Sequence, residues 1–233
     1  MGMIQIAATD GAGRFDCLVA MPKAQPAGAV VLIQEIFGIN SAMHALSEWV
    51  AGMGFIALTP DLFWRQQPNV VLEPDQGQAQ WEQAFAFMNG FDQEKGLADI
   101  AATIAHGRSM AGSNGKTGTM GFCLGGRMAF KAATGTGSDC NVSYYGVMLD
   151  ALVAEKPAFR GPLLLHIAEK DKFVPPEAQA KILEGVQGNP RVAAHVYPGV
   201  DHAFARMGGH SWDGRAATIA NGRTAEFLVK YLG

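Results

Sequence analysis

The chain has 233 residues, of which 48% are hydrophobic and 17% are charged, and its formal net charge is −3 at pH 7. This composition supports a sizeable core and excludes a disordered chain, and the slight negative charge argues against nucleic acid or an anionic membrane surface as a partner. The longest apolar runs, such as residues 29–33, have the length of strands and are too short to span a bilayer. No basic segment followed by a long apolar one opens the chain, and its three cysteines suit a reducing compartment, so we expect a cytoplasmic protein.

Short apolar runs and helical periodicities alternate along the chain. A run of apolar residues is typical of a buried parallel strand, and apolar residues three or four apart are typical of an amphipathic helix. In chain order, the expected elements are strands Ile4–Thr9, Phe15–Met21 and Ala29–Gln34, a helix over 41–53 capped by Asn40 or Ser41, strand Phe55–Thr59, a helix around 97–104, strand Thr117–Phe122, helix Leu124–Thr134, strands Val142–Tyr145 and Leu163–Ala168, a helix opening at Pro175, strand Ala193–Tyr197 and a closing helix over 217–231.

This alternation predicts an α/β fold with a mostly parallel sheet and helices on both of its faces. No linker rich in proline or serine divides the chain, so we expect a single domain over residues 1–233. The segment 64–92 is polar, rich in glutamine and loosely patterned. Such a segment beside a sheet edge is a natural lid or pocket wall.

The stretch Gly121-Phe122-Cys123-Leu124-Gly125 joins an expected strand to an expected helix. A G-x-C-x-G turn in this context has the pattern of a nucleophile elbow, with cysteine in place of serine. Its glycines allow the strand and helix to pack closely around a strained central residue. The bend raises Cys123 above the carboxyl ends of the strands and places its sulfur at a helix N-terminus, where a thiolate is favoured.

Later loops supply an acid and a base in the order that this fold requires. Asp171 follows the strand Leu163–Ala168, and His202 follows the strand that ends at Tyr197. The imidazole would take the thiol proton, and the carboxylate would orient the imidazole. Asp201 is the alternative acid. Because it is adjacent to His202 in the chain, its carboxylate could reach the ring nitrogen Nδ1 only with a contorted backbone, so we favour Asp171. The alternative role of Asp171 is to cap the helix that opens at Pro175.

These motifs, taken together, resemble the dienelactone hydrolase (carboxymethylenebutenolidase) family over essentially the whole chain. The resemblance implies an α/β-hydrolase fold, no organic cofactor and a catalytic triad of Cys123, His202 and Asp171. It also implies that Glu35 helps to deprotonate the thiol when substrate arrives; the alternative is a pocket-wall acid paired with Arg206. Besides the elbow, the blocks that carry the resemblance are QEIFGIN (Gln34–Asn40), LTPDLFWR (Leu58–Arg65), EKDKFVP (Glu169–Pro175) and YPGVDHAF (Tyr197–Phe204).

The implied activity is carboxylic ester hydrolysis, namely the conversion of a dienelactone to maleylacetate in the degradation of aromatic compounds. Cys123 would attack the lactone carbonyl and form a thioester, which His202 would release with water. In this fold the residue after the nucleophile and the first strand–helix loop supply the oxyanion donors. We therefore assign the oxyanion hole to the backbone N–H groups of Leu124 and Ile36.

The implied substrate carries a carboxylate, and Arg206 matches the family's cation for that group. Members that act on dienelactone are expected to bring a second arginine from the middle segment. Residues 68–99 contain no arginine, and Trp81 stands near the expected place. Arg65 is a possible replacement. The further residues that we expect in the substrate pocket are Trp64, Tyr144, Tyr145 and Phe37.

Other interpretations stay open at this level. A lone cysteine is more often an inert buried thiol, and we give that interpretation to Cys17 and Cys140. A cysteine esterase for a different small ester, a ligand-binding protein on the same fold and a redox sensor are alternatives to a lactonase. No Cys/His cluster has zinc spacing, so we expect no metal. We expect a monomer.

Overall fold

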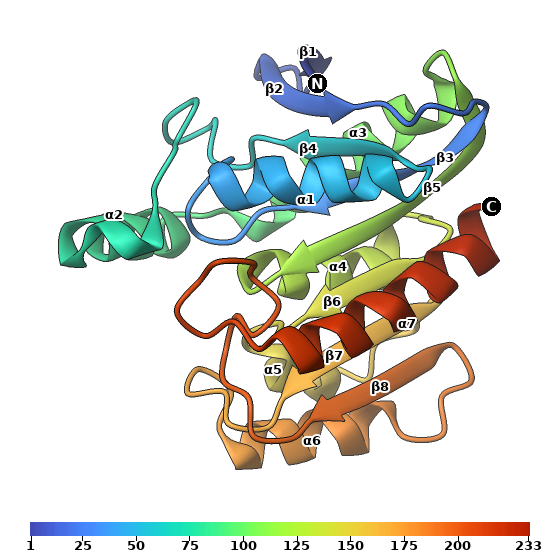
Figure 1. The fold of residues 1–233 in the computed structure, drawn as a ribbon. Helices are drawn as coiled ribbons and strands as arrows, with labels where there is room; N and C mark the ends of the chain where they lie inside the picture. Colours follow the sequence, from blue (N-terminus) through green and yellow to red (C-terminus); the bar gives the residue numbers. More distant parts are fainter.

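The computed structural model describes all 233 residues, which form one eight-stranded sheet with helices on both faces (Figure 1). The strand order is β1-β2-β4-β3-β5-β6-β7-β8. β1 is antiparallel to β2, which is antiparallel to β4, and all the other neighbours run parallel. The strands are β1 (Gly2–Ala7), β2 (Arg14–Ala20), β3 (Ala27–Ile33), β4 (Ile56–Pro60), β5 (Ser113–Phe122), β6 (Asn141–Tyr144), β7 (Leu163–Ala168) and β8 (Val192–Tyr197). The opening strand pair and the mainly parallel sheet are therefore as predicted.

Two helix layers cover the sheet because the central strands are apolar on both faces. In β3, Val30 and Leu32 belong to the core beneath α1 (Ser41–Gly52) and α7 (Gly214–Leu232), which lie in front of the sheet in Figure 1. Val31 and Ile33 pack instead with residues of the helices behind it. The helices α3 (Gln93–Ser109) and α4 (Leu124–Gly135) supply those residues, and α5 (Leu149–Ala154) and α6 (Pro176–Val186) follow on the same side of the sheet.

Side-chain caps fix the start of several helices, as the sequence indicates for α1. The Asn40 side chain accepts a hydrogen bond from the Met43 N–H at 3.3 Å, so Asn40 and not Ser41 is the cap. Asp92 and Asp213 cap α3 and α7 in the same way. The helix α5 was not expected from the sequence, because its six residues are too few to show a periodicity.

The segment 64–92 folds into the short 3₁₀ helix η1 (Pro74–Gln76) and the helix α2 (Gln78–Asn89). Figure 1 shows α2 standing out from the sheet, beside the edge where β3, β5 and their parallel neighbours end. Its buried residues are Ala84 and Phe87, and the Phe87 ring stacks on Phe63 with centroids 5.3 Å apart. This contact anchors α2 at the edge where the loops after the parallel strands converge. No helix of the chain is both long and apolar enough to cross a membrane.

Candidate active site

The turn between β5 and α4 has the backbone of a strained elbow. Cys123 adopts φ +56° and ψ −115°, a conformation that costs a non-glycine residue free energy. A Cβ atom on Gly121 would lie 1.9 Å from the Gly125 carbonyl oxygen. A Cβ atom on Gly125 would lie 2.2 Å from the Ile33 carbonyl oxygen. Both glycines are thus required by backbone contacts, and the elbow presents Cys123 to a cavity at the strand ends.

His202 and Asp171 meet beside this cysteine. The His202 Nδ1 atom lies 2.8 Å from Asp171 Oδ2, and both side chains are buried. The other carboxylate oxygen, Oδ1, accepts the Phe173 N–H at 2.9 Å. Asp201 faces away from the ring; it accepts the backbone N–H of His202 and pairs with Lys172. Asp171 does not cap α6, whose N-cap residue is Pro175.

The His202 ring lies between the rings of Tyr145 and Phe173, at centroid distances of 4.9 and 4.8 Å. Burial by itself lowers the pKa of this imidazole, but the charge of Cys123 and the interaction with Asp171 outweigh burial and raise the pKa above its ordinary value. The buried Nε2 atom has no hydrogen-bond partner of normal geometry, although Cys123 lies close enough to raise the pKa. Loose contacts of this kind are common between catalytic groups before substrate binds.

Glu35 and Arg206 form a buried ion pair at one side of the site. Arg206 Nε donates to Glu35 Oε2 at 2.8 Å, and the two side chains are 11% and 7% exposed. Burial lowers the pKa of the guanidinium, but Glu35 outweighs burial and raises it. The Glu35 Oε1 atom is buried and has no partner. The guanidinium also lies over the Phe37 ring, 5.3 Å from its centroid.

The backbone around the elbow provides unpaired N–H groups. The N–H of Ile36 makes no hydrogen bond within the chain, and that of Leu124 lies in the first turn of α4, where no intrahelical partner exists. The neighbouring loops carry further left-handed residues, Tyr145 at φ +38°, Met148 at φ +53° and Ala203 at φ +64°. A strained backbone conformation persists only where the surrounding structure fixes the residue in it, and such residues are frequent at functional sites.

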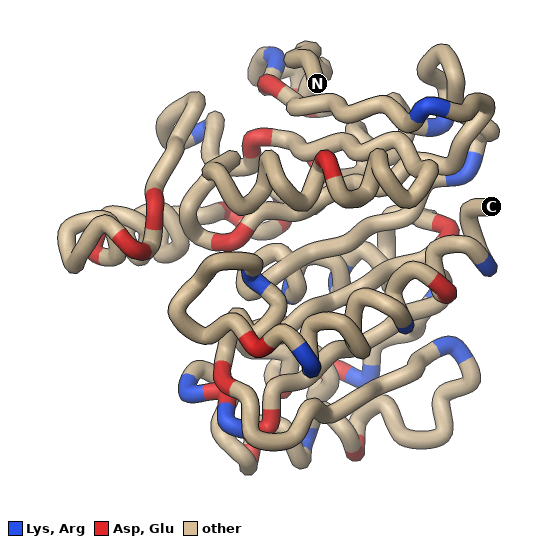
Figure 2. The backbone as a smooth tube through the Cα atoms, viewed as in Figure 1, with Lys and Arg blue, Asp and Glu red and all other residues tan.

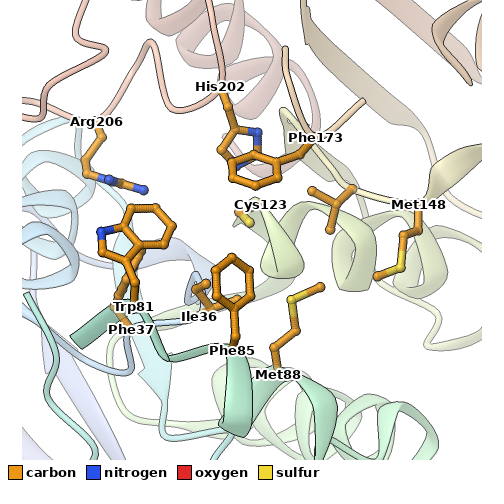
Figure 3. Close-up of a pocket in the computed structure, with 11 residues that line it drawn as sticks. Ile36, Phe37, Trp81, Phe85, Met88, Cys123, Met148, Phe173, His202 and Arg206 are labelled. Carbon is orange, nitrogen blue, oxygen red and sulfur yellow. The ribbon is translucent and has the colours of Figure 1, made fainter. Parts of the chain in front are cut away.

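These groups surround a cavity of about 200 Å³, drawn in Figure 3. This volume is below the range of about 300–1,000 Å³ that drug-sized ligands occupy, so the cavity suits a small molecule. Two polar side chains, His202 and Arg206, lie at its upper edge in Figure 3, around the central Cys123. The residues that line it are Ile36, Phe37, Trp81, Phe85, Met88, Cys123, Val147, Met148, Phe173, His202 and Arg206.

Three of the expected pocket residues lie elsewhere, and we correct those expectations here. Trp64 and Arg65 are held by the fully buried carboxylate of Asp99, through a 2.9 Å bond from Trp64 Nε1 and two bonds from the guanidinium. Tyr144 turns to the other side of its strand, where its hydroxyl lies 2.7 Å from Thr224 Oγ1. None of the three lines the cavity.

Tyr145, in contrast, lies at the site without lining the cavity around Cys123. It borders a second cleft on the α1 side together with Glu35 and Arg206, so the ion pair separates the two spaces. Burial and the nearby Glu35 charge raise the pKa of the Tyr145 hydroxyl well above its ordinary value. This tyrosine is therefore a neutral hydrogen-bonding group at neutral pH.

The cavity includes residues that the sequence analysis missed. Phe85 and Met88 follow Trp81 at spacings of four and seven, which places all three on one face of α2. That spacing was readable in the sequence. Met148 and Phe173 lie in loops, and no local pattern signals their place.

The other two cysteines are fully buried and far less suited to reaction. Burial raises the pKa values of both the Cys17 and the Cys140 thiols. All three cysteines of the chain are free. Cys123 is the one that reaches a cavity.

Comparison with known proteins gives a consistent result. The model of the dienelactone hydrolase family matches residues 15–232. The "Putative carboxymethylenebutenolidase" of Azospirillum brasilense is 49% identical over 232 residues, which cover 95% of each chain. The carboxymethylenebutenolidase of Pseudomonas putida is 39% identical over 226 residues, covering 97% of this chain and 95% of the relative.

Among solved structures, a "Putative Dienelactone Hydrolase" from Klebsiella pneumoniae superposes with a TM-score of 0.82 at 20% identity. The match covers 99% of this chain and all of the other. With the strand order, this likeness confirms the α/β-hydrolase fold that the elbow motif and the alternating elements indicated.

Proposed function

The chain belongs to the dienelactone hydrolase family and is a hydrolase of esters or lactones, and from this premise we propose that Cys123 is its nucleophile, in a triad with His202 and Asp171. The observation that carries the proposal is the strained elbow, which presents one thiol to a cavity beside a His–Asp pair. The charge of Cys123 and then the pairing with Asp171 raise the pKa of His202, so its ring is suited to take and hold a proton during the reaction.

In the first half of the reaction, the Cys123 sulfur forms a bond to the lactone carbonyl carbon. The carbonyl oxygen takes up the negative charge and accepts hydrogen bonds from the N–H groups of Leu124 and Ile36. One such donor typically contributes about 2.7–4 kcal/mol to a transition state of this kind. The ring C–O bond then breaks, a thioester forms, and the departing oxygen takes the proton held by His202.

In the second half, a water molecule attacks the thioester. His202 Nε2 accepts a proton from this water while Asp171 holds the opposite nitrogen, Nδ1. The C–S bond breaks, the acid leaves, and Cys123 returns to its thiolate form. No redox change occurs, and each proton that the histidine gives in the first half is regained in the second.

For the substrate we propose a small unsaturated lactone that carries one carboxylate, with dienelactone giving maleylacetate as the specific case. The carboxylate would pair with the Nη atoms of Arg206, because the Glu35 bond uses only Nε. That contact would compete with Glu35 for the guanidinium. A released Glu35, whose Oε1 is already without a partner, is the alternative to His202 as acceptor of the thiol proton, and it would then supply the proton that the departing oxygen takes.

We also propose that the protein works as a monomer in the cytoplasm. One chain supplies every residue of the cavity, and its three free cysteines suit a reducing compartment.

The test is the turnover of dienelactone by wild type, Cys123→Ala and a control, Cys17→Ala, which removes a buried thiol far from the cavity. We expect Cys123→Ala to lose at least about three orders of magnitude in kcat/KM, as removal of a nucleophile does, while the control stays near wild type. Undiminished turnover in Cys123→Ala would show that Cys123 is not the nucleophile. Turnover of another small ester but not of dienelactone would select the esterase alternative, and stoichiometric binding without product would select a binding protein.

A further inference from the structure

One wall of the cavity is apolar and comes from a single helix. Trp81, Phe85 and Met88 lie on one face of α2, and Figure 3 shows all three directed at the space before Cys123. Ala84 and Phe87, which border this face, are buried, and the stacking of the Phe87 ring on Phe63 holds the helix in place. We call Trp81, Phe85 and Met88 the α2 wall.

The α2 wall has no free polar group to offer a ligand. The Trp81 ring nitrogen donates to the Pro74 carbonyl oxygen at 2.9 Å, so its one polar atom is already used. The ring itself packs edge-on against Phe37, with centroids 4.9 Å apart. No lysine or arginine lies between residues 66 and 92, Glu82 is the one charged residue of α2, and Figure 2 shows no basic residue on this helix.

Exposed apolar side chains gather at the mouth of the same cavity. Phe85, Met148 and Phe173 are 39%, 41% and 40% exposed, and they come from α2 and from two separate loops. Large apolar side chains that converge on one opening mark a binding surface, because each leaves apolar area in contact with water. In Figure 3, Met88 and Met148 lie on the side of Cys123 away from Arg206.

Building on the proposed lactone hydrolysis, we infer that this far side is a subsite for an apolar substituent of the substrate. The substrate class is an unsaturated lactone with at most one anionic group, placed at Arg206, and an alkyl or aryl group packed on Phe85, Met88 and their neighbours. Arg206 is the one cation among the residues that line the cavity, so a charged group on the far side would face apolar side chains and is selected against.

Three furan-2(5H)-ones test this inference, since they share the reacting ring and differ only at position 5. They carry a methylidene, a benzylidene or a 4-carboxybenzylidene group, and kcat/KM follows from the loss of their ultraviolet absorbance. In wild type we expect the benzylidene compound to exceed the methylidene compound by about tenfold or more, a typical ratio for an apolar pocket. The added carboxylate should reverse most of that gain.

The variants Phe85→Ala and Met88→Gln should each lower kcat/KM for the benzylidene compound by about fivefold to tenfold and should lower it less for the methylidene compound, whose smaller substituent makes less contact with the wall, so the ratio of the two rates falls. Ile219→Ala, which truncates an exposed side chain on α7, is the control and should leave both rates unchanged. Equal rates for the two compounds in wild type, or a ratio that both wall variants leave unchanged, would overturn the subsite.

The same assay separates this inference from the proposed function. If the methylidene compound is turned over in wild type and not in Cys123→Ala, the hydrolase proposal stands, whatever the benzylidene preference. If turnover survives in Cys123→Ala, or no lactone is hydrolysed, the proposed function fails and the subsite fails with it.

Discussion

Replacing Arg206 by methionine should destabilise the protein strongly, because it leaves the Glu35 carboxylate buried without its cation. The two side chains are 2.8 Å apart and about nine-tenths buried, so solvent screens their attraction little. Removal of one partner from a buried pair typically costs about 3–5 kcal/mol. For a chain of this size, each kcal/mol corresponds to roughly 2–4 °C in Tm, so the melting temperature should fall by about 6–20 °C.

The double variant Glu35→Leu/Arg206→Met measures the interaction between the two side chains directly. Replacing both members by apolar side chains of similar size is often neutral, so the double variant should be more stable than the sum of the single variants predicts. We expect a coupling free energy of at least about 2 kcal/mol from urea unfolding, followed by tryptophan fluorescence and circular dichroism. Additive effects, or a loss below about 1 kcal/mol for Arg206→Met, would show that water reaches the pair, and would refute the argument.

Three further predictions concern the elbow and the triad. Gly125→Ala should abolish activity and lower the Tm, because its Cβ would lie 2.2 Å from a backbone oxygen; activity near wild type in this variant would contradict the elbow geometry. Iodoacetamide should label Cys123 in the folded protein and spare the other two cysteines, whose thiol pKa values burial raises; peptide mass mapping checks this, and labelling of Cys17 would count against it. In the folded state the charge of Cys123 and then the pairing with Asp171 raise the pKa of His202, so the stabilisation from these interactions is full below the unfolded pKa of about 6.5 and is lost as pH rises through the folded pKa. The stability advantage of wild type over Asp171→Asn should therefore shrink between neutral and alkaline pH in urea unfolding, and a constant advantage would contradict the pairing.

The elbow and its partners were predictable because local sequence dictates their geometry. Gly121 is needed by a backbone contact within the turn and Gly125 by the close approach of β3, and both belong to the known pattern of the elbow. Chain order places the loops of Asp171 and His202 at the ends of neighbouring parallel strands. The choice of Asp171 over Asp201 followed from the same logic, since a residue adjacent to the histidine cannot easily reach its ring.

The pocket walls were less predictable because they depend on contacts between distant segments. Trp64 and Arg65 follow β4, whose end lies near the site, but Asp99, 34 residues further on from Arg65, binds them both. Tyr144 and Tyr145 are adjacent aromatic residues that are both buried, so the sequence alone does not fix which of them faces the site.

The measurement that tests the central claim most directly is the mass of the intact protein after rapid quenching with a slowly hydrolysed lactone. If Cys123 is the nucleophile, wild type should gain the mass of one whole lactone molecule, because ring opening releases no leaving group. The adduct should be a thioester that hydroxylamine removes, and it should map to the elbow peptide. The adduct should accumulate further in His202→Gln if its deacylation is slowed more than its acylation, and it should be absent from Cys123→Ala. An adduct that persists in Cys123→Ala, or product formed by wild type at full rate with no covalent species in any variant, would contradict the account.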